Sequence, residues 1–524
     1  MKREGMILQI EDFAHQTWDI IVIGGGATGL GVALDAASRG YKTLCLEQHD
    51  FSKGTSSRST KLVHGGVRYL AQGDISLVLE ALHERGLMYQ NAPHLVHNQP
   101  FVIPNYVWWG GPFYTVGLKV YDMMGGKLGL GPSVSLSKEE VIEKLPNIKQ
   151  DGLLGGVVYH DGQFDDARMA INLAQTCAEN GGVLINYFKV TGLLKNDGII
   201  SGVKAIDQET GKQYSLNAKV VVNAIGVFVD SILQLDEPGV AATIRPSQGV
   251  HIILNKEFLP GDAAIMIPQT DDGRVLFAVP WHNKVVVGTT DTPMKEPVLE
   301  PVALESEIEF ILKTAGRYLT KPPTRRDVQS IFAGLRPLAA PAEGEISTRE
   351  ISRGHKIIVS NTGLVTIIGG KWTTYRKMAE ETVDKAIMVG GLFERDCVTR
   401  NMAIHGYVKN VHRQNYLHIY GSDQPYIEDL MAADPDLAKA LHAKLPYTGA
   451  EVIWAVRHEM ARTLEDVLSR RTRALLLDAR ASIDMAPVVA GIMAKELNKN
   501  ESWIKRQVAD FKALASNYLL VDYS

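Results

Sequence analysis

The sequence has few cysteines, no long apolar run and almost no excess of either charge. Its three cysteines are Cys45, Cys177 and Cys397, which are far apart and form no Cys-x-x-Cys pair. A disulfide framework or a zinc site is therefore not expected, and a reducing compartment fits. No segment reaches the roughly 18 to 20 apolar residues that a membrane-spanning helix needs. The N-terminal MKREGMILQIEDF also lacks the apolar run of a signal peptide.

The charge balance excludes one class of partner. The 524 residues include 55 basic and 59 acidic side chains, for a formal net charge of −4. So small an imbalance gives no general reason to expect nucleic acid as a partner. The chain is too long for one ordinary hydrophobic core, so two or three domains are expected. Its 45% hydrophobic content is typical of a soluble globular protein, which we expect in the cytoplasm.

The chain opens with a β-α-β unit. Residues 18–23 (WDIIVI) and 42–47 (KTLCLE) are predicted strands, and residues 30–38 are the helix between them. The turn before the helix is Gly-x-Gly-x-x-Gly, whose glycines permit a tight bend, the approach of a pyrophosphate and close helix packing. The helix N-terminus favours an anion. The predicted pyrophosphate contacts are Gly24, Gly26, Ala27, Thr28 and Gly29.

Glu47 ends the second predicted strand. A carboxylate at this position accepts hydrogen bonds from a ribose 2′-hydroxyl and repels a 2′-phosphate, so NADP is disfavoured. The β-α-β unit by itself leaves FAD and NAD both open.

A polar, glycine-rich loop follows Glu47 and reads GTSSRSTKLVHGGVRYL (54–70). Further motifs are DGQ and DAR within 161–168, PSQGVH (246–251), GLRPL (334–338) and GGKWTTYR (369–376). In this order the segments resemble the FAD-dependent glycerol-3-phosphate dehydrogenases of the glycine oxidase and D-amino-acid oxidase superfamily. The resemblance implies FAD as cofactor and oxidation of sn-glycerol 3-phosphate to glycerone phosphate, with hydride transfer to flavin N5.

The resemblance also implies contacts to the flavin and its phosphate tail. Reduced flavin is anionic near N1, so a helix N-terminus or a cation there stabilises it. The turn 370–374, which carries Lys371, suits this role, although its threonines also suit plain helix capping. The implied contacts are Thr55, Ser56, Ser57, Lys61, Leu62, His64, Gly66, Val190, Ala224, Gly226, Gly370, Thr373 and Thr374.

A phosphorylated substrate requires cations for its dianion. Arg68, Arg336 and Arg353 come from distant segments that are otherwise apolar or glycine-rich. A buried arginine needs an anionic partner, which is either a phosphate or an internal carboxylate. The resemblance favours the substrate for all three arginines. Tyr69 is expected either to donate a hydrogen bond beside Arg68 or to pack in the core.

Removal of the substrate hydroxyl proton calls for a base, and histidine titrates near neutrality. His251 and His64 are the two candidates, each of which also suits an ordinary core position. The resemblance favours His251 for the substrate pocket and His64 for the cofactor. Lys371 is expected to hold the hydroxyl oxygen or the phosphate. The base stays open within a predicted catalytic set of His251, Arg336, Arg353 and Lys371.

The kind of electron acceptor is predicted from the redox motifs that the sequence lacks. The sequence shows no second Gly-x-Gly-x-x-Gly, no iron–sulfur cysteine set and no haem motif, so the acceptor is diffusible. The resemblance implies ubiquinone or menaquinone, and therefore peripheral association with lipid at the inner face of the cell membrane. The oligomeric state stays open, with a homodimer as one option.

Two segments are candidates for membrane contact. Residues 101–124 carry seven aromatic side chains, five of them from position 108 onward, with Lys119 and Lys127 nearby. Such a segment suits either the headgroup layer or a core or dimer contact. The basic group at 470–473 suits lipid, a solvated helix end or an internal ion pair. The five aromatic residues from position 108 onward are Trp108, Trp109, Phe113, Tyr114 and Tyr121.

Three alternative functions compete with this interpretation. One is a glycerol-3-phosphate oxidase that uses O₂ directly. Another is an amine or amino-acid oxidase of the same superfamily, which needs one arginine for a carboxylate instead of a group of cations. The third is a flavin-binding sensor or scaffold that recruits a partner through its C-terminal helices.

The predicted fold class is α/β. It combines a Rossmann-type FAD-binding domain, an inserted and mostly antiparallel β-sheet substrate (cap) domain, and an α-helical C-terminal domain. The C-terminal helices are expected over 428–445, with an interruption at Pro435, and over 451–469 and 482–497, from their apolar spacing. The predicted boundaries are 16–90, 150–240 and 350–390 for the FAD-binding domain, 91–149 and 241–349 for the cap domain, and 395–524 for the C-terminal domain.

Overall fold

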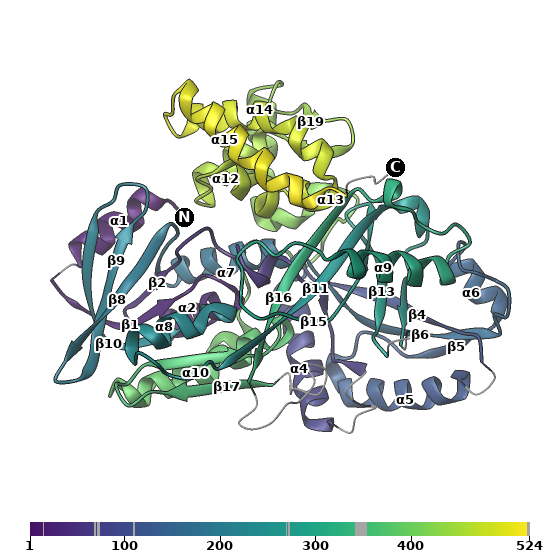
Figure 1. Ribbon diagram of the computed structural model, residues 1–524, viewed down its shortest axis with the longest axis horizontal. Helices are drawn as coiled ribbons and strands as arrows, with labels where there is room; N and C mark the ends of the chain where they lie inside the picture. Colours follow the sequence, from purple (N-terminus) through teal and green to yellow (C-terminus); the bar gives the residue numbers. More distant parts are fainter. Residues whose placement is uncertain are drawn as a thin grey trace.

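The computed structural model describes residues 1–13, 15–67, 70, 74–107, 110–268, 270, 273–340 and 354–520. Two large β-sheets lie beside each other, and a helical part rests above their junction (Figure 1). This arrangement confirms the predicted fold class.

The first sheet has a parallel core. β1 (Thr17–Ile23) pairs in parallel with β2 (Thr43–Leu46) on one side and with β10 (Gln213–Asn223) on the other. Almost all side chains of β1 and β2 are buried, as expected for central parallel strands. The strand order is β17 (His355–Val359), β18 (Val365–Gly369), β10, β1, β2, β7 (Val183–Ile185). β9 (Ile199–Asp207) pairs with β10, and β8 (Phe188–Asn196) pairs with β9. The helices of this part are α1 (Arg3–Asp12), α2 (Ala27–Ser38), α7 (Asp166–Glu179), α8 (Val229–Asp236) and α10 (Tyr375–Val389).

The second sheet is mostly antiparallel, and only β12 and β4 pair in parallel within its main path. Its order is β15 (Thr292–Pro293), β11 (Ile244–Asn255), β14 (Lys284–Gly288), β13 (Leu276–Trp281), β12 (Ala264–Ile267), β4 (His97–Asn105), β6 (Gly155–Gln163), β3 (Leu62–Val63), with β16 (Ser330–Ala339) on β11 and β5 (Val134–Leu136) on β6. The helices beside it are α4 (Ile75–Asn91), α5 (Gly110–Gly125), α6 (Lys138–Lys144) and α9 (Glu305–Tyr318).

Two strands of this second sheet depart from the predicted domain division. The ranges 16–90 and 150–240 place both β3 and β6 in the FAD-binding domain. In the structure β6 pairs with β4 along its whole length, from Gln163 opposite His97 to Gly155 opposite Asn105. β3 pairs with β6 in turn. The chain therefore crosses from one sheet to the other within the ranges assigned to the FAD-binding domain. The domain boundaries themselves stay a prediction.

The C-terminal part is helical with one small hairpin. Its apolar core packs against Ile253, Trp281, Val286 and Phe332 of the second sheet. The helices therefore pack against β11 and β16, above which they lie in Figure 1. The elements are α11 (Gln424–Ala433), β19 (Ala440–His442), β20 (Leu445–Thr448), α12 (Gly449–His458), a π-helical turn (Asp466–Arg471), α13 (Ala474–Leu477), α14 (Ala479–Glu496) and α15 (Glu501–Ala515).

Two of the predicted C-terminal helices are too long. The first segment ends as a helix at Ala433, just before the interruption expected at Pro435, because Asp434 precedes the proline and takes an extended conformation. The helix does not resume after the proline. The hairpin of β19 and β20 follows, and Thr448 then caps α12 through a capping box with Glu451. The helix expected to end at 469 stops at His458, two residues before Met460 with its positive φ of 54°. Among the residues that the model describes, no helix has the length and apolarity needed to span a bilayer.

Candidate active site

The glycine turn between β1 and α2 brings three backbone segments together. Gly24 has φ +111°, a conformation that favours glycine. A Cβ on Gly24 would lie 2.7 Å from the carbonyl oxygen of Ala224, and one on Gly29 would lie 1.9 Å from that of Gly24. Gly26 caps α2 in an extended conformation. Close backbone packing thus excludes side chains at Gly24 and Gly29, next to a helix N-terminus that favours an anion such as a pyrophosphate.

A cavity of about 750 Å³ opens beside this turn. Glu47 lines it, and its carboxylate accepts hydrogen bonds from the amides of Gly25 (2.6 Å) and His49 (2.7 Å). Burial raises the pKa of Glu47. A dinucleotide suits this cavity, because the glycine backbone can approach its pyrophosphate and the Glu47 carboxylate can accept a hydrogen bond from its ribose. We call it the dinucleotide cavity. The predicted cofactor residues that line it are Gly24, Gly26, Ala27, Thr28, Glu47, Thr55, Ser56, Val190, Ala224, Gly226 and Gly370.

A second cavity, of about 290 Å³, adjoins the first, and both are lined by Thr55, Gly370 and Lys371. Leu62, His64, Gly66 and Thr373 line this second cavity, which we call the catalytic cavity. Four predicted cofactor residues line neither cavity. They are Gly29, which packs the helix on the strand, and Ser57, Lys61 and Thr374, which are buried beside the site.

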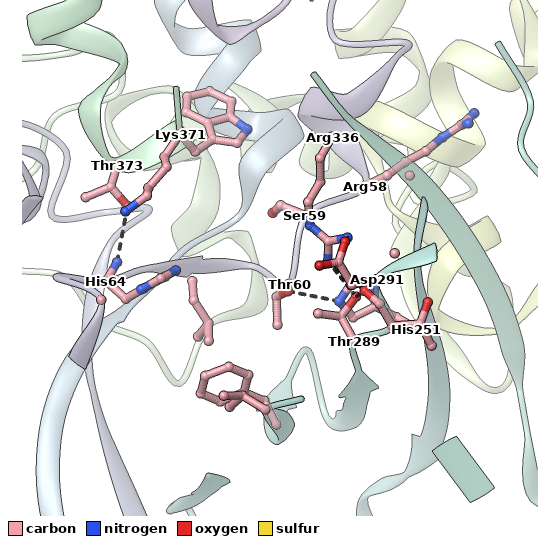
Figure 2. Close-up of a pocket in the computed structure, with 18 of the residues that line it drawn as sticks. Arg58, Ser59, Thr60, His64, His251, Thr289, Asp291, Arg336, Lys371 and Thr373 are labelled. Carbon is pink, nitrogen blue, oxygen red and sulfur yellow. Dashed lines mark hydrogen bonds and ion pairs between the residues drawn. The ribbon is translucent and has the colours of Figure 1, made fainter. Parts of the chain in front are cut away.

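Residues 55–64, which we call the flavin-side loop, are held from several directions. The amide of Ala27 donates to Ser56 Oγ (2.9 Å), and Trp372 Nε1 donates to the carbonyl of Ser56 (2.8 Å). Thr55 Oγ1 donates to the carbonyl of Leu335 on β16 (2.6 Å). The amide of His64 donates to Thr373 Oγ1 (3.2 Å), as drawn in Figure 2. The loop is therefore fixed to the dinucleotide helix, to the turn before α10 and to the cap sheet.

His251 lies on β11 and lines the catalytic cavity with a side chain that is almost fully buried. Its Nε2 lies 2.9 Å from Thr60 Oγ1, and its ring stacks on Phe332 at 4.9 Å. Burial, reinforced by the charges of Lys61 and Arg336, holds the pKa of His251 well below its usual value. The imidazole is therefore neutral at physiological pH and can accept a proton.

Arg336 reaches the same cavity from β16. Its Nη1 lies 3.3 Å from Asp291 Oδ1, and its Nη2 donates to Thr289 Oγ1 (3.1 Å) and to the carbonyl of Thr290 (3.0 Å). Figure 2 shows Arg336 directed toward Asp291 and Thr289. The internal carboxylate that the sequence left open for this arginine is thus present. Its side chain is 21% exposed and still lines the cavity.

Lys371 approaches from the first sheet, immediately before the short helical turn Trp372–Thr374 and α10. In Figure 2 it lies with Thr373 on the side of the cavity opposite His251. The structure thus brings His251, Arg336 and Lys371 together from three remote segments. Three predicted substrate residues, Arg68, Tyr69 and Arg353, lie outside the described residues.

Several residues of the cavity were not predicted from sequence. Thr60, Thr289 and Asp291 line it beside His251 and Arg336, and Arg58 lines it while directing its guanidinium elsewhere, to Glu300 (2.6 Å). The position of Thr60 in the hydroxyl-rich loop was the sequence feature that could have indicated its place in the cavity. The signal for Asp291 was an acidic residue inside an otherwise neutral Gly-Thr-Thr-Asp turn.

The interpretation of the basic group 470–473 as a membrane contact is wrong. The side chains of Arg470, Arg471 and Arg473 are at most 2% exposed, and they pair with Asp50 and Asp166. The internal ion pair that the sequence left open is the one that forms.

The aromatic membrane candidate has a mixed outcome. Tyr121 is a core residue, because its hydroxyl is buried and donates to Asp161 (2.9 Å). Trp108, Trp109 and the side chain of Phe113 lie outside the described residues.

A parallel nucleotide-binding sheet, a second sheet beside it and a cavity with charged side chains at their junction are typical of a flavoprotein oxidoreductase. The chain belongs to the FAD-dependent oxidoreductase family, whose model matches residues 19–376, and FAD is its cofactor. A second model, the C-terminal domain of alpha-glycerophosphate oxidase, matches residues 360–503.

Individual proteins match over nearly the whole chain. It is 38% identical to the mitochondrial glycerol-3-phosphate dehydrogenase of Schizosaccharomyces pombe, over 95% of this chain and 87% of that protein. Identity to the mitochondrial glycerol-3-phosphate dehydrogenase of Homo sapiens is also 38%, over 95% and 72%. The structure of the glycerol-3-phosphate dehydrogenase from Bacillus halodurans complexed with FAD superposes with a TM-score of 0.81 at 28% identity, covering 100% of this chain and 99% of that one.

Proposed function

We propose that this protein oxidises sn-glycerol 3-phosphate to glycerone phosphate and passes the electrons to a membrane quinone. The observation that carries the proposal is the convergence of His251, Arg336 and Lys371 on a cavity that adjoins the dinucleotide cavity. The relatives named glycerol-3-phosphate dehydrogenase support the choice of substrate.

The cations of the cavity suit the phosphate. An arginine fork matches phosphate oxygens, and a lysine adds a point charge. Asp291 shares the charge of Arg336 and holds its guanidinium in place. Lys371 contributes a second cation from the opposite side. In this proposal Arg68, Tyr69 and Arg353 complete the phosphate site, as the sequence resemblance implies.

The hydride acceptor is supplied by FAD when it is bound. The protein's own part is to orient the alcohol and to accept its hydroxyl proton. His251 is neutral before substrate binds, because burial and two nearby cations lower its pKa. A bound dianion opposes those cations and therefore raises the affinity of the imidazole for a proton. His251 is thus our assignment for the base, held in place by Thr60 and Phe332.

An anaerobic titration tests the substrate. Glycerol 3-phosphate should bleach the flavin absorbance band of the purified holoenzyme, whereas amino acids should leave it unchanged. Bleaching by an amino acid, without any by glycerol 3-phosphate, would favour the amine or amino-acid oxidase alternative. A flavin that no alcohol or amine reduces would favour the sensor alternative.

The acceptor needs a separate assay. After reduction by glycerol 3-phosphate, a soluble ubiquinone or menaquinone analogue should reoxidise the flavin much faster than air-saturated buffer does. Rapid O₂ uptake without quinone would overturn the dehydrogenase assignment in favour of the oxidase.

Helix α5 supports the peripheral membrane contact. Val116, Val120 and Met123 are exposed by 66%, 44% and 80%, and their spacing of four and three residues places them on one helix face. Lys119 and Lys127 are exposed on the same helix or just after it. An exposed apolar face with nearby lysines suits the lipid headgroup layer at the inner face of the cell membrane.

A double substitution tests this surface. Val116→Glu with Met123→Glu should abolish sedimentation with vesicles of anionic phospholipid, because each carboxylate must enter the interface. Val488→Glu is the matched control, since Val488 is 54% exposed on α14, in the C-terminal part. Equal vesicle binding by the double variant and the control would remove α5 from the membrane site.

A further inference from the structure

The C-terminal part sends three arginines into the FAD-binding part. Arg470 and Arg471 both donate to Asp50, at 2.6 Å from Nε and 2.7 Å from Nη1 respectively. Asp50 follows Glu47 by three residues and is itself fully buried. The loop beyond the ribose-binding position is therefore fastened from the C-terminal side.

Arg473 extends this fastening to the flavin-side loop. It has a left-handed backbone conformation, with φ +68°, between the π-helical turn and α13. Its Nη2 donates to the carbonyl of Ser57 and to Asp166 Oδ1, both at 2.9 Å. Its Nη1 donates to the carbonyl of Ser469 (2.8 Å), which anchors the guanidinium to its own domain.

Asp166, the first residue of α7, holds the loop on its other oxygen. Oδ2 accepts hydrogen bonds from the amide and hydroxyl of Ser59, at 3.1 and 2.7 Å, and from Lys61 Nζ at 2.6 Å. Lys61 Nζ also donates to the carbonyl of Ser57 (2.7 Å). Residues 57–61 therefore wrap around one carboxylate, and Arg473 closes the ring of contacts.

The same residues contact His251 from two directions. Thr60, between the two residues that Asp166 holds, lies 2.9 Å from His251 Nε2 through its hydroxyl. Lys61 Nζ lies 5.1 Å from the ring centre of Phe332, which stacks on His251. A shift of the loop at Ser59 or Lys61 would move both contacts of the imidazole.

Stability alone does not account for this cluster. Arg473, Asp166 and Lys61 have fully buried side chains. Burying such charges costs desolvation that well-packed apolar side chains of the same volume would avoid. What apolar packing would not provide is the direction of the hydrogen bonds that fix the loop.

We propose that Arg473 is a positioning residue: through Asp166 it holds the flavin-side loop, and so His251, in the catalytic geometry. The helical C-terminal domain is then a functional part of the flavin site. The catalytic half of this inference rests on the proposed function, in which His251 accepts the substrate proton.

The test compares Arg473→Lys and Arg473→Gln with the wild-type holoenzyme. Lysine keeps the charge beside Asp166 but has a single nitrogen, so it cannot donate to Ser57 and Asp166 as Nη2 does and also to Ser469 as Nη1 does. Arg457→Lys is the control, because Arg457 pairs with Glu496 inside the C-terminal domain and its side chain is 47% exposed.

Hydrogen exchange provides the readout that is independent of activity. Peptides covering residues 57–63 should exchange at least tenfold faster in both Arg473 variants and at the wild-type rate in Arg457→Lys. FAD content and substrate Kd should stay within threefold of the wild type. The rate of flavin reduction at saturating glycerol 3-phosphate should fall at least tenfold, with the lysine variant less affected than glutamine.

Three results would overturn the proposal: unchanged exchange in 57–63, a reduction rate within twofold of the wild type, or loss of folded, FAD-containing protein in both variants. The last would show that Arg473 serves folding. If the wild type is not reduced by glycerol 3-phosphate, the proposed function fails, and the exchange result still decides whether Arg473 holds the loop.

Discussion

Replacing Arg336 by alanine should weaken substrate binding while leaving FAD bound. Arg336 lines the catalytic cavity but not the dinucleotide cavity, and none of its described contacts reaches the glycine turn. The change therefore removes a cation from the proposed phosphate site. It also leaves Asp291, which accepts from Ser247 and pairs with Arg336, as a carboxylate facing the incoming dianion.

The lost contact to the phosphate sets the smallest change expected, to which the repulsion by Asp291 adds. A hydrogen bond to a charged group contributes about 1.5–3 kcal/mol, and about 1.4 kcal/mol corresponds to a tenfold change in Kd. The Kd for glycerol 3-phosphate should therefore rise by about 10- to 150-fold. The assay is anaerobic titration of the flavin spectrum. Arg325→Ala is the matched control, since this cap-domain arginine pairs with Glu305 at the surface.

A second substitution separates the two effects. Asp291→Asn, added to Arg336→Ala, removes the repelling carboxylate and should recover part of the lost affinity, roughly tenfold of it. A single variant that binds glycerol 3-phosphate within twofold of the wild type would take Arg336 out of the phosphate site. A double variant weaker than the single one would refute the repulsion by Asp291.

Three further predictions concern the base, the cofactor turn and the pH dependence of stability. His251→Asn should slow flavin reduction by about 100-fold or more without loss of FAD, as expected for removal of a general base; stopped-flow absorbance checks this, and a change under threefold would exclude His251. Gly29→Ala should yield protein without FAD, because the new Cβ would lie 1.9 Å from the carbonyl of Gly24; a normal flavin spectrum would contradict this. Burial lowers the pKa of His94 to about 4, so below pH 6.5 the unfolded chain binds a proton that the folded protein does not, and stability is lost as pH falls toward 4. Between pH 7 and pH 5 the lost stability is about 2 kcal/mol. Denaturant melts should therefore show the unfolding free energy of the wild type falling over this range relative to that of His94→Gln. Parallel pH profiles for the two proteins would contradict this prediction.

Local patterns predicted the dinucleotide end of the site well. The glycine turn and Glu47 lie within one β-α-β unit, so the spacing of neighbouring residues is enough to place them. Gly29 is the instructive case, since it was expected to allow close helix packing and does so without lining the cavity.

Contacts between remote segments were not predictable in the same way. β6 belongs to the second sheet because it pairs with β4, which lies some 50 residues earlier in the chain. The alternation of apolar and polar residues predicts a strand but does not identify its partner. The sequence left lipid, solvent and an internal ion pair open for Arg473, because its buried partner Asp166 is distant in sequence. In the C-terminal part, apolar spacing suggested a helix through residue 445, whereas residues 440–448 form a hairpin.

The central claim is that the cavity beside FAD recognises a dianion. Its most direct test is the second-order rate constant for flavin reduction by sn-glycerol 3-phosphate compared with that for glycerol, which lacks the phosphate. Two charge-assisted contacts of about 1.5–3 kcal/mol each predict a preference of at least about 100-fold for the phosphate ester. A ratio below tenfold would contradict the account, because the cations contributed by Arg336 and Lys371 would then serve some other purpose.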